Sequence, residues 1–329
     1  MTSNIKSYQK FRHAGLAIDP IHVGSGGSRL GYVDNTIVRD PITKIPKVPG
    51  SSLAGVVRSY AAMAKGKYPD CAGQGQAKPD GSGGHCGKHD CPICTVFGFA
   101  RGNLGGFAGL AAFSDAQVLL FPVATREGPV WVTAPGALRQ LDELREVQEP
   151  SDLDAVYRSS DKSTGSALNL GWILLEVRSD WEKFAELKKP LEDLGIPEYI
   201  ISRLVVTSDK LFHHIVNSNL EVRTSVAINP VTGAAEEGAL FTYEALPRAT
   251  VLYWEVTCRN PAHFRVNGAP ISFKGNGQDV TIDDVHDVVS VADPYLEHLG
   301  IGGMGTRGMG RLRVLKHVGT QNPSGAKNT

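Results

Sequence analysis

The amino-acid sequence predicts an α+β fold, and three observations on the 329-residue chain support this class. Several short apolar segments rich in β-branched and aromatic residues indicate strands. Other segments, interspersed among them, have the apolar spacing of amphipathic helices. With 41% hydrophobic and 21% charged residues, the chain can bury a sizeable core in one large domain or two small ones.

The first expected elements are a strand at the end of residues 7–19 and, after a long loop, a helix over residues 51–66. Apolar residues at helical spacing indicate this helix: Leu53, Val56, Val57, Tyr60, Ala61 and Ala64. Ser51 or Ser52 is placed to cap its first turn. The chain therefore opens with a strand, a loop and a helix.

The later elements alternate between strands, helices and long stretches without a clear period. Strands are expected over residues 116–124, 128–134, 250–258 and 311–318, and helical segments within 180–194 and 284–299. Residues 66–110 and 200–240 exceed ordinary loop lengths. We therefore expect two insertions with functions of their own.

Charge is distributed unevenly along the chain. A net charge of zero argues against a polyanion-binding protein. However, the first 66 residues hold nine Lys or Arg against three Asp or Glu, residues 301–329 hold five basic residues and no acid, and the middle carries −11. This asymmetry fits a molecule with one basic face and one acidic face, the latter free to bind a basic partner or another copy of the chain. The alternative is that the charges are spread over the solvent-exposed surface without a binding role.

The cysteine pattern predicts a metal site. No apolar run has the length of a membrane span, and the first residues lack the apolar centre of a signal peptide, so we expect a cytoplasmic protein without a membrane partner. In that reducing compartment, clustered cysteines favour metal over disulfides. The candidate ligands are Cys71, Cys86, Cys91 and Cys94, with His85 and His89 as alternatives to either outer cysteine.

Around these cysteines the chain is rich in Gly, Pro, Lys and Asp and has almost no apolar residues before Ile93. Such a segment cannot fold around its own core, whereas zinc binding would supply folding energy. A closed four-ligand site leaves no position for water, so we expect structural zinc in a 66–110 insertion and not a zinc hydrolase. The alternative, a redox role for the CPIC motif, lacks a thioredoxin-like strand and helix.

Two glycine-rich loops are candidates for binding an anion. In "HVGSGG", Gly24, Ser25 and Gly26 allow several N–H groups to converge on a phosphate, but the lysine of a nucleoside-triphosphate loop is missing. "LGIGGMGTRGMGRLRV" places six glycines in residues 300–310, together with Arg307. An extended anion such as a nucleic-acid backbone could approach this stretch; a pair of tight turns is the alternative.

The order of these motifs resembles the RAMP superfamily of CRISPR systems. The features that carry this resemblance are the opening strand, "PGSSLAGVVRS", "CPICTVFG" and the glycine-rich loop near the C-terminus. More narrowly, "HVGSG" and "GYVDNTIVRDPITKIPKVPGSSLAGVVRS" are similar to the repeated backbone subunit of type III effector complexes. The segments "FSDAQVLLFPVATREGPVWVTAP" and "EEGALFTYEALPRAT" resemble the Cmr (type III-B) version most, while "VDNTIVRDP" and the cysteine knuckle are also Csm-like (type III-A). The resemblance spans residues 14–135 and 217–314.

The resemblance implies a single RAMP domain over residues 1–329. Its core would be a ferredoxin-like palm, similar to an RNA-recognition motif, with a β-hairpin thumb from residues 205–240. Copies would stack head to tail along a guide crRNA beside other type III effector subunits, and each thumb would interrupt the duplex of guide and target RNA.

The resemblance also implies site residues. Asp34 matches the family's catalytic aspartate, and the expected guide-binding residues are His22, Gly24, Ser25, Gly26, Ser51, Ser52, Arg58, Gly302, Gly303 and Arg307. Tyr243 and Glu244 match positions whose roles the sequence leaves open.

The expected activity is metal-dependent cleavage of complementary target RNA at regular intervals. Asp34 would deprotonate a 2′-hydroxyl or hold Mg²⁺ or Mn²⁺ near the phosphate. Without the resemblance, Asp34 would be interpreted as a turn residue. Two other functions remain open: a backbone subunit that only binds RNA, and a stand-alone repeat-processing endoribonuclease that uses a histidine such as His22.

Overall fold

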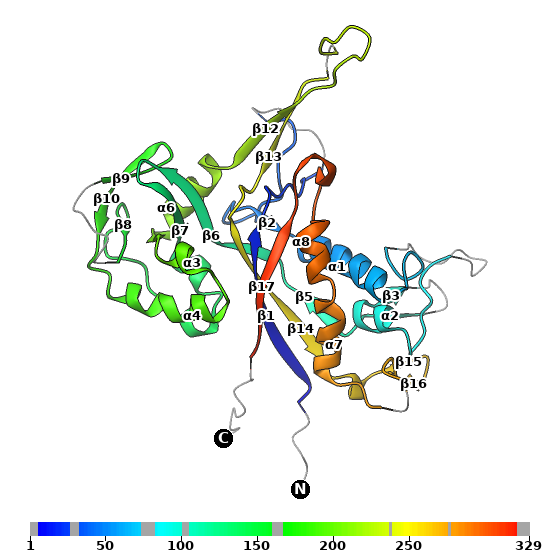
Figure 1. Ribbon diagram of the computed structural model, residues 1–329. Helices are drawn as coiled ribbons and strands as arrows, with labels where there is room; N and C mark the ends of the chain where they lie inside the picture. The colour runs from blue at the N-terminus through cyan, green and yellow to red at the C-terminus, as the bar shows by residue number, and fades with distance from the viewer. Residues whose placement is uncertain are drawn as a thin grey trace, which may run out of the picture.

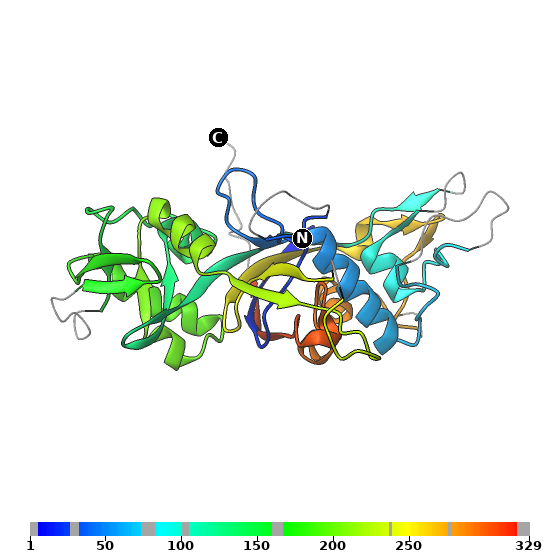
Figure 2. The ribbon, with the colours of Figure 1, turned by 90° about the horizontal axis from the view of Figure 1, so that it is seen from above.

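The computed structural model describes residues 6–26, 33–73, 83–100, 105–159, 167–236, 239–275 and 278–320. The last glycine of HVGSGG and parts of the 66–110 segment, residues 74–82 and 101–104, lie outside the described residues. The molecule is elongated, with a central sheet between two lateral lobes and a hairpin that projects from the centre (Figures 1 and 2).

The central sheet has the order β17-β1-β14-β6, and all neighbours are antiparallel. Its strands are β1 (Tyr8–Ala17), β6 (Ala116–Thr125), β14 (Val251–Arg259) and β17 (Leu312–Thr320). Two short strands extend it: β5 (Ala111–Phe113) pairs with β14, and β2 (Lys47–Val48) pairs with β6. The strands expected from the sequence are therefore confirmed to within two residues.

Three helices cover one face of the central sheet (Figure 1). They are α1 (Gly50–Ala64), α7 (Ile282–Ser290) and α8 (Asp293–His298). The predicted serine cap of α1 is wrong, because Pro49 is the N-cap residue and makes no side-chain cap bond. The carboxylate of Asp115 accepts a hydrogen bond from the Gly50 N–H at 2.8 Å and takes that role.

The first lateral lobe continues the sheet from β6 in the order β7-β11-β8-β10-β9. Its strands are β7 (Gly128–Thr133), β8 (Val156–Tyr157), β9 (Ala167–Leu170), β10 (Ile173–Arg178) and β11 (Leu204–Val206). Its helices are α3 (Pro135–Leu138), α4 (Lys188–Asp193), α5 (Glu198–Ile201) and α6 (Asp209–Ser218). A separate apolar cluster around Trp131, Tyr157 and Leu191 fills the lobe.

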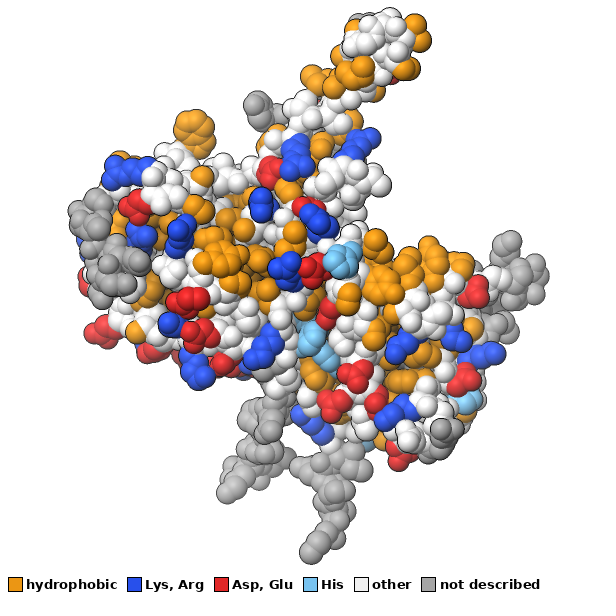
Figure 3. All heavy atoms as spheres, in the orientation of Figure 1, with side chains coloured by type: hydrophobic (Ala, Val, Ile, Leu, Met, Phe, Trp, Pro, Cys, Tyr) orange, Lys and Arg blue, Asp and Glu red, His pale blue; other side chains and the backbone are white. Residues whose placement is uncertain are grey.

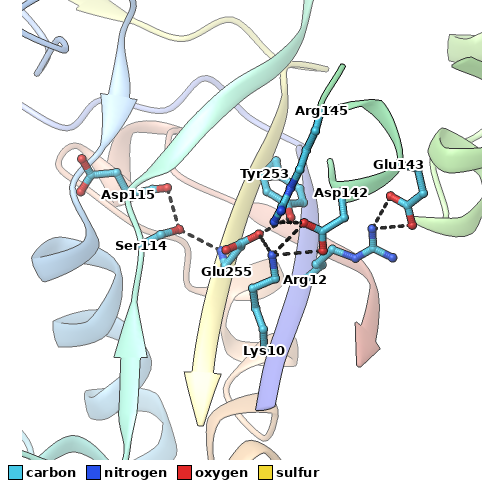
Figure 4. A network of polar contacts seen from close by, with 9 residues as sticks. All are labelled: Lys10, Arg12, Ser114, Asp115, Asp142, Glu143, Arg145, Tyr253 and Glu255. Atoms are coloured by element: carbon cyan, nitrogen blue, oxygen red, sulfur yellow. Dashed lines mark hydrogen bonds and ion pairs between the residues drawn. The ribbon is translucent and has the colours of Figure 1, made fainter. Parts of the chain in front are cut away.

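A polar network connects this lobe to the central sheet (Figure 4). Lys10 on β1 lies between the carboxylates of Asp142, at 3.2 Å, and Glu255 on β14, at 2.8 Å. Arg12, also on β1, binds Glu143 at 2.6 Å, and its side chain is only 7% exposed. Since each cation has an acidic partner, the network joins two parts of one chain and is not free to bind an anion.

The second lateral lobe consists of short elements next to α1 and α7. They are α2 (Pro92–Phe97), β3 (Phe99–Ala100), β4 (Gly106–Phe107), β15 (Arg265–Val266) and β16 (Ala269–Pro270). This lobe contains the clustered cysteines.

The projecting hairpin pairs β12 (Glu221–Ser225) with β13 (Phe241–Ala245). The sequence placed a hairpin insertion at 205–240, whereas residues 204–218 form β11 and α6 of the first lobe and the hairpin spans 221–245. Exposed apolar side chains occupy its tip, with Val231 91% exposed. Along the described residues, no helix combines the length and apolar character that a bilayer span requires.

Candidate functional site

The two glycine-rich loops predicted to bind an anion lie next to each other. The carbonyl of His22 accepts a hydrogen bond from the Gly303 N–H at 2.8 Å, and the two residues form an isolated β-bridge. At Gly302, φ is +87°, and a Cβ atom would lie 2.3 Å from the His22 carbonyl oxygen. Only glycine allows this approach, so the segment 300–310 is fitted to the HVGSGG turn.

Strand β13 anchors the segment that contains Asp34. The Asn35 N–H donates to the Thr242 carbonyl at 3.0 Å, and the Glu244 N–H donates to the Asn35 carbonyl at 3.0 Å. Further along, Ile21 forms an isolated bridge with Leu246. The base of the β12–β13 hairpin and the segment between β1 and β2 therefore form one hydrogen-bonded unit.

Asp34 is an exposed carboxylate with a fixed orientation. Its Oδ2 accepts hydrogen bonds from the Thr242 N–H at 2.7 Å and from the Thr242 hydroxyl at 2.9 Å. These bonds, the backbone one first, lower the pKa of Asp34. The group is therefore ionised at neutral pH, and its exposed position lets it accept a proton or bind a cation.

His22 is buried and has a structural partner. It is 7% exposed, and its Nδ1 lies 2.6 Å from the Glu244 carbonyl, to which it donates a hydrogen bond. The edge of the ring packs against Tyr243, with ring centroids 5.9 Å apart. His22 thus joins the glycine turn to β13, which is a poor arrangement for a general base that must reach a substrate.

The sequence did not identify Thr242 and Arg39 as site residues, and it left the role of Glu244 open. The Arg39 guanidinium binds the Glu244 carboxylate at 2.9 Å and donates to the Asn217 side chain on α6 at 2.9 Å. The three groups connect the Asp34 segment, the hairpin and the first lobe. Residues about 200 positions apart make these contacts, so local patterns gave no signal for Thr242 or Arg39.

The other predicted RNA contacts are mostly at the surface. Gly24, Ser25, Gly26 and Ser51 are exposed, and Ser52 is partly exposed in the first turn of α1. Arg307 is exposed in a short 3₁₀ turn, with Nη1 3.4 Å from the Ser225 hydroxyl on β12. Lys and Arg side chains gather around the base of the hairpin, and apolar ones occupy its tip (Figure 3).

Arg58, like His22, is a predicted guide-binding residue whose side chain is buried, and the prediction that it contacts RNA is corrected. Its side chain is buried: Nε donates to the Cys71 carbonyl at 2.8 Å and Nη1 donates to the Gly98 carbonyl at 2.7 Å. Arg58 shares a helix face with Leu53, Val57 and Ala61, which are also buried. A guanidinium in this position is not accessible to an RNA phosphate.

The four predicted thiolate ligands meet in the second lobe. One sulfur atom from each of Cys71, Cys86, Cys91 and Cys94 lies within 4.8 Å of the others. The Cys71–Cys91 and Cys86–Cys94 sulfur distances are 3.7 and 3.6 Å. The alternative histidines point elsewhere: His85 Nε2 bonds the Ala72 carbonyl, and His89 Nδ1 bonds the Ser272 hydroxyl. The cluster could hold a metal ion through four cysteines.

The surroundings fit a bound cation with four thiolates. Hydrogen bonds from neighbouring thiols, that of Cys94 first, lower the pKa of Cys91 to about 5, whereas burial raises the pKa of Cys71 to about 11 and the hydrogen bond with Cys91 raises the pKa of Cys94. Arg58 Nη2 is buried without a hydrogen-bond partner. Because a divalent ion with four thiolates carries a net charge of −2, this guanidinium supplies both a compensating charge and a free donor.

Comparisons with known proteins agree with this architecture. A model of the RAMP superfamily matches residues 16–313. The CRISPR system Cmr endoribonuclease Cmr4 of Pyrococcus furiosus is 28% identical over 249 residues, or 72% of this chain and 77% of the relative. The Cms endoribonuclease Csm3 of Methanothermobacter thermautotrophicus is 34% identical over 88 residues, or 27% of this chain and 28% of the relative.

Solved structures share the fold along nearly the whole chain. The crystal structure of oligomeric Cmr4 from Pyrococcus furiosus aligns with a TM-score of 0.62 and 18% identity, covering 95% of this chain and 99% of that one. A chain of the type III-B Cmr-beta complex bound to cognate target RNA aligns with a TM-score of 0.58 and 19% identity, covering 93% and 97%. Since the family match extends from the end of β1 into β17, the protein belongs to the RAMP superfamily.

Proposed function

We propose that this protein is a backbone subunit of a type III CRISPR effector complex that binds guide RNA and cleaves complementary target RNA. The observation that carries this proposal is the position of Asp34, an exposed ionised carboxylate fixed at the base of a projecting hairpin. The similarity to Cmr4 and Csm3, both named endoribonucleases, supports it.

In this proposal Asp34 is the catalytic residue. RNA cleavage requires a 2′-hydroxyl in line with the adjacent phosphate, and A-form geometry keeps the two apart. The hairpin would act as a thumb whose apolar tip displaces a nucleotide and relieves that geometry. Asp34 would then accept the hydroxyl proton. A divalent ion such as Mg²⁺ or Mn²⁺, held by the same carboxylate, would neutralise charge on the phosphate.

The guide RNA would lie along the two adjoining glycine loops. The exposed backbone at Gly24 and Gly26 is suited to phosphate oxygens, whereas the Ser25 N–H donates to the Thr36 carbonyl and holds the turn in place. Gly302 and Gly303 leave room for the RNA to approach. Ser51 and Ser52 stand in the first turn of α1, where their hydroxyls would donate hydrogen bonds to phosphate oxygens. Arg307 would supply a guanidinium for a phosphate beside the thumb.

His22 would support this RNA-binding surface without contacting the RNA. Its carbonyl bonds Gly303 and its ring bonds β13, so it fixes the two loops relative to each other. We therefore assign His22 a positioning role in guide binding and not a role in the chemistry.

We further propose that the chain is a single RAMP domain with a ferredoxin-like palm. The order β17-β1-β14-β6, with α1 and α7 in the two crossovers, supports this description. The thumb would comprise residues 221–245 of the predicted 205–240 insertion. The 66–110 insertion would bind structural zinc through its four cysteines, with Arg58 offsetting their charge; bound zinc would supply the folding energy that the segment lacks.

The proposed partners follow from the same assignment. They are guide crRNA, target RNA, further copies of this chain stacked head to tail and other type III subunits. The structural neighbours described as an oligomer and as part of a complex with target RNA support this set.

The test is a cleavage assay on the assembled complex. The protein is reconstituted with guide RNA and the other type III subunits, and end-labelled matched target is added with Mg²⁺, with Mn²⁺ or with a chelator. We expect products at regular intervals only with a divalent ion. Tight target binding without products would indicate a binding-only subunit, whereas metal-independent cutting of hairpin RNA by the isolated chain would indicate a repeat-processing nuclease.

Thr242 is expected to position Asp34 for cleavage. In Thr242→Val the carboxylate loses the hydroxyl donor and keeps the backbone N–H, so it is oriented by one bond in place of two. We expect target cleavage to slow by roughly tenfold, with target affinity unchanged, because small misplacements of a catalytic group are costly. Single-turnover rates measure the effect.

The matched control for this prediction is Thr224→Val. Thr224 is exposed and lies directly opposite Thr242 on β12. The control should cut at the normal rate, and Thr242→Ser should recover most activity because it restores the hydroxyl. Equal rates in the two valine variants would show that the Thr242 hydroxyl does not position Asp34.

A further inference from the structure

Three histidines from distant parts of the sequence meet in the central sheet, away from the cysteine cluster and from Asp34. His13 lies on β1, His286 on α7 and His317 on β17. The Nε2 atoms of His286 and His13 are 3.2 Å apart, and the Nδ1 atoms of His317 and His13 are 3.3 Å apart. One nitrogen from each ring lies within 4.8 Å of the other two.

The surrounding residues hold two of these rings in place. Phe11 stacks on His286 with ring centroids 3.9 Å apart, and Trp254 stacks on His13 at 5.3 Å. His13 is 1% exposed and His286 is 7% exposed. Only the His317 side chain, 34% exposed, connects the cluster with solvent.

Carboxylates lie on the outer side of the cluster. Asp293 Oδ2 is 3.4 Å from His317 Nε2, which leaves His317 Nδ1 directed toward His13. Asp287 supplies a negative charge whose field reaches His317. A carboxylate bonded to the outer nitrogen of an imidazole is the usual arrangement behind a metal-binding histidine, because it fixes the ring and strengthens the other nitrogen as a ligand.

We propose that His13, His286 and His317 form a second metal site, for a divalent transition ion of the zinc class. Imidazole nitrogen suits Zn²⁺ and its neighbours in the series, whereas Mg²⁺ and Ca²⁺ take oxygen ligands. Zn–N bonds of about 2.0–2.1 Å in a tetrahedral site place ligand nitrogens about 3.3 Å apart. The facing nitrogens of His286 and His13, 3.2 Å apart, and those of His317 and His13, 3.3 Å apart, are each close to that spacing, but they use different nitrogens of His13.

Occupation of this site changes one contact in the cluster. His13 meets His317 through Nδ1 and His286 through Nε2, and a single ion takes only one of these nitrogens. A small rotation of one partner ring therefore accompanies binding. The bound ion would then link β17, the outermost strand of the sheet, to both β1 and α7.

The test is the metal content of the intact protein, and it does not depend on RNA cleavage. Purified full-length chain is equilibrated with Zn²⁺, freed of excess ion and analysed for zinc per chain. His317→Gln should bind one zinc fewer than wild type, and thiol titration should show the cysteine cluster equally protected in both. His298→Gln, which changes an exposed histidine on α8, should match wild type in both measurements.

A second variant and a stability measurement keep the test valid if His317→Gln fails to fold. Asp293→Asn replaces the outer carboxyl group by an amide of the same size, and it should weaken zinc binding about tenfold or more. Added zinc should raise the thermal unfolding midpoint of wild type more than that of His317→Gln, measured at the same zinc concentrations. Equal zinc content in wild type and folded His317→Gln would overturn the proposal and leave the three rings as a hydrogen-bonded chain.

Discussion

Complexes assembled with Asp34→Asn should bind target RNA normally and cut it at least about a hundredfold more slowly than wild type. Asparagine keeps the size of the side chain, and its carbonyl oxygen can still accept the hydrogen bonds of Thr242. It cannot take up a proton at neutral pH and is a weaker ligand for a divalent ion. Removing a general base costs about 10²–10⁴ in rate, whereas replacing a turn residue would cost nothing in chemistry.

Asp40→Asn is the matched control for this prediction. Asp40 lies in the same segment, and its carboxylate accepts hydrogen bonds from the N–H groups of Ile42 and Thr43, both at 2.9 Å. Hydrogen bonds, that of Thr43 first, lower its pKa as at Asp34. A time course of target cleavage beside a gel shift measures both variants. Normal cutting by Asp34→Asn would remove the catalytic assignment, and equal losses in both variants would show that only the fold of the segment matters.

The second large effect is expected at the cysteine cluster. Cys91→Ser should lose one equivalent of zinc and lower the free energy of unfolding by more than about 4 kcal/mol, because metal binding energy in such segments is folding energy. Cys91 is 3% exposed and directly precedes α2, so the loss should first unfold the second lobe. Metal analysis and denaturant unfolding, followed by circular dichroism, measure the two effects.

Cys258→Ser provides the comparison. Cys258 is buried on β14 outside the cluster, and the same substitution there places a hydroxyl in an apolar site. We expect it to cost about 1–3 kcal/mol with no change in zinc content. If Cys91→Ser kept its zinc and lost no more stability than Cys258→Ser, the cluster would be four free thiols.

The sequence was a good guide to the regular elements of the central sheet. Segments such as 116–124 and 250–258 are rich in β-branched and aromatic residues, and each is a strand within a residue of the expected bounds. The helix α6 had a visible signal, with Ser208 as its cap and Leu211, Phe212, Ile215 and Val216 on one buried face. It was missed because residues 200–240 were treated as a single insertion.

The candidate site was less predictable because its contacts are long-range. Asp34 and Thr242 are 208 positions apart, so no local pattern reveals that one orients the other. Arg58 shows a different difficulty, since the family resemblance implied an RNA contact although the residue lies on the buried face of α1. The cysteines were identified because their spacing is visible within a short stretch of sequence, whereas His13 lies 273 positions before His286 and 304 before His317.

The anchoring of Asp34 to β13 has a geometric consequence for the proposed cleavage. Asp34 is hydrogen-bonded to β13 of the hairpin whose tip would displace the nucleotide, so the tip and the carboxylate cannot move independently. Each subunit would therefore cleave the target at a fixed number of nucleotides from the one that its own thumb displaces. Lengthening the tip would change which base is displaced but leave the offset of the scissile bond from the hairpin base unaltered. The distance between successive cuts would then equal the distance between neighbouring subunits along the RNA.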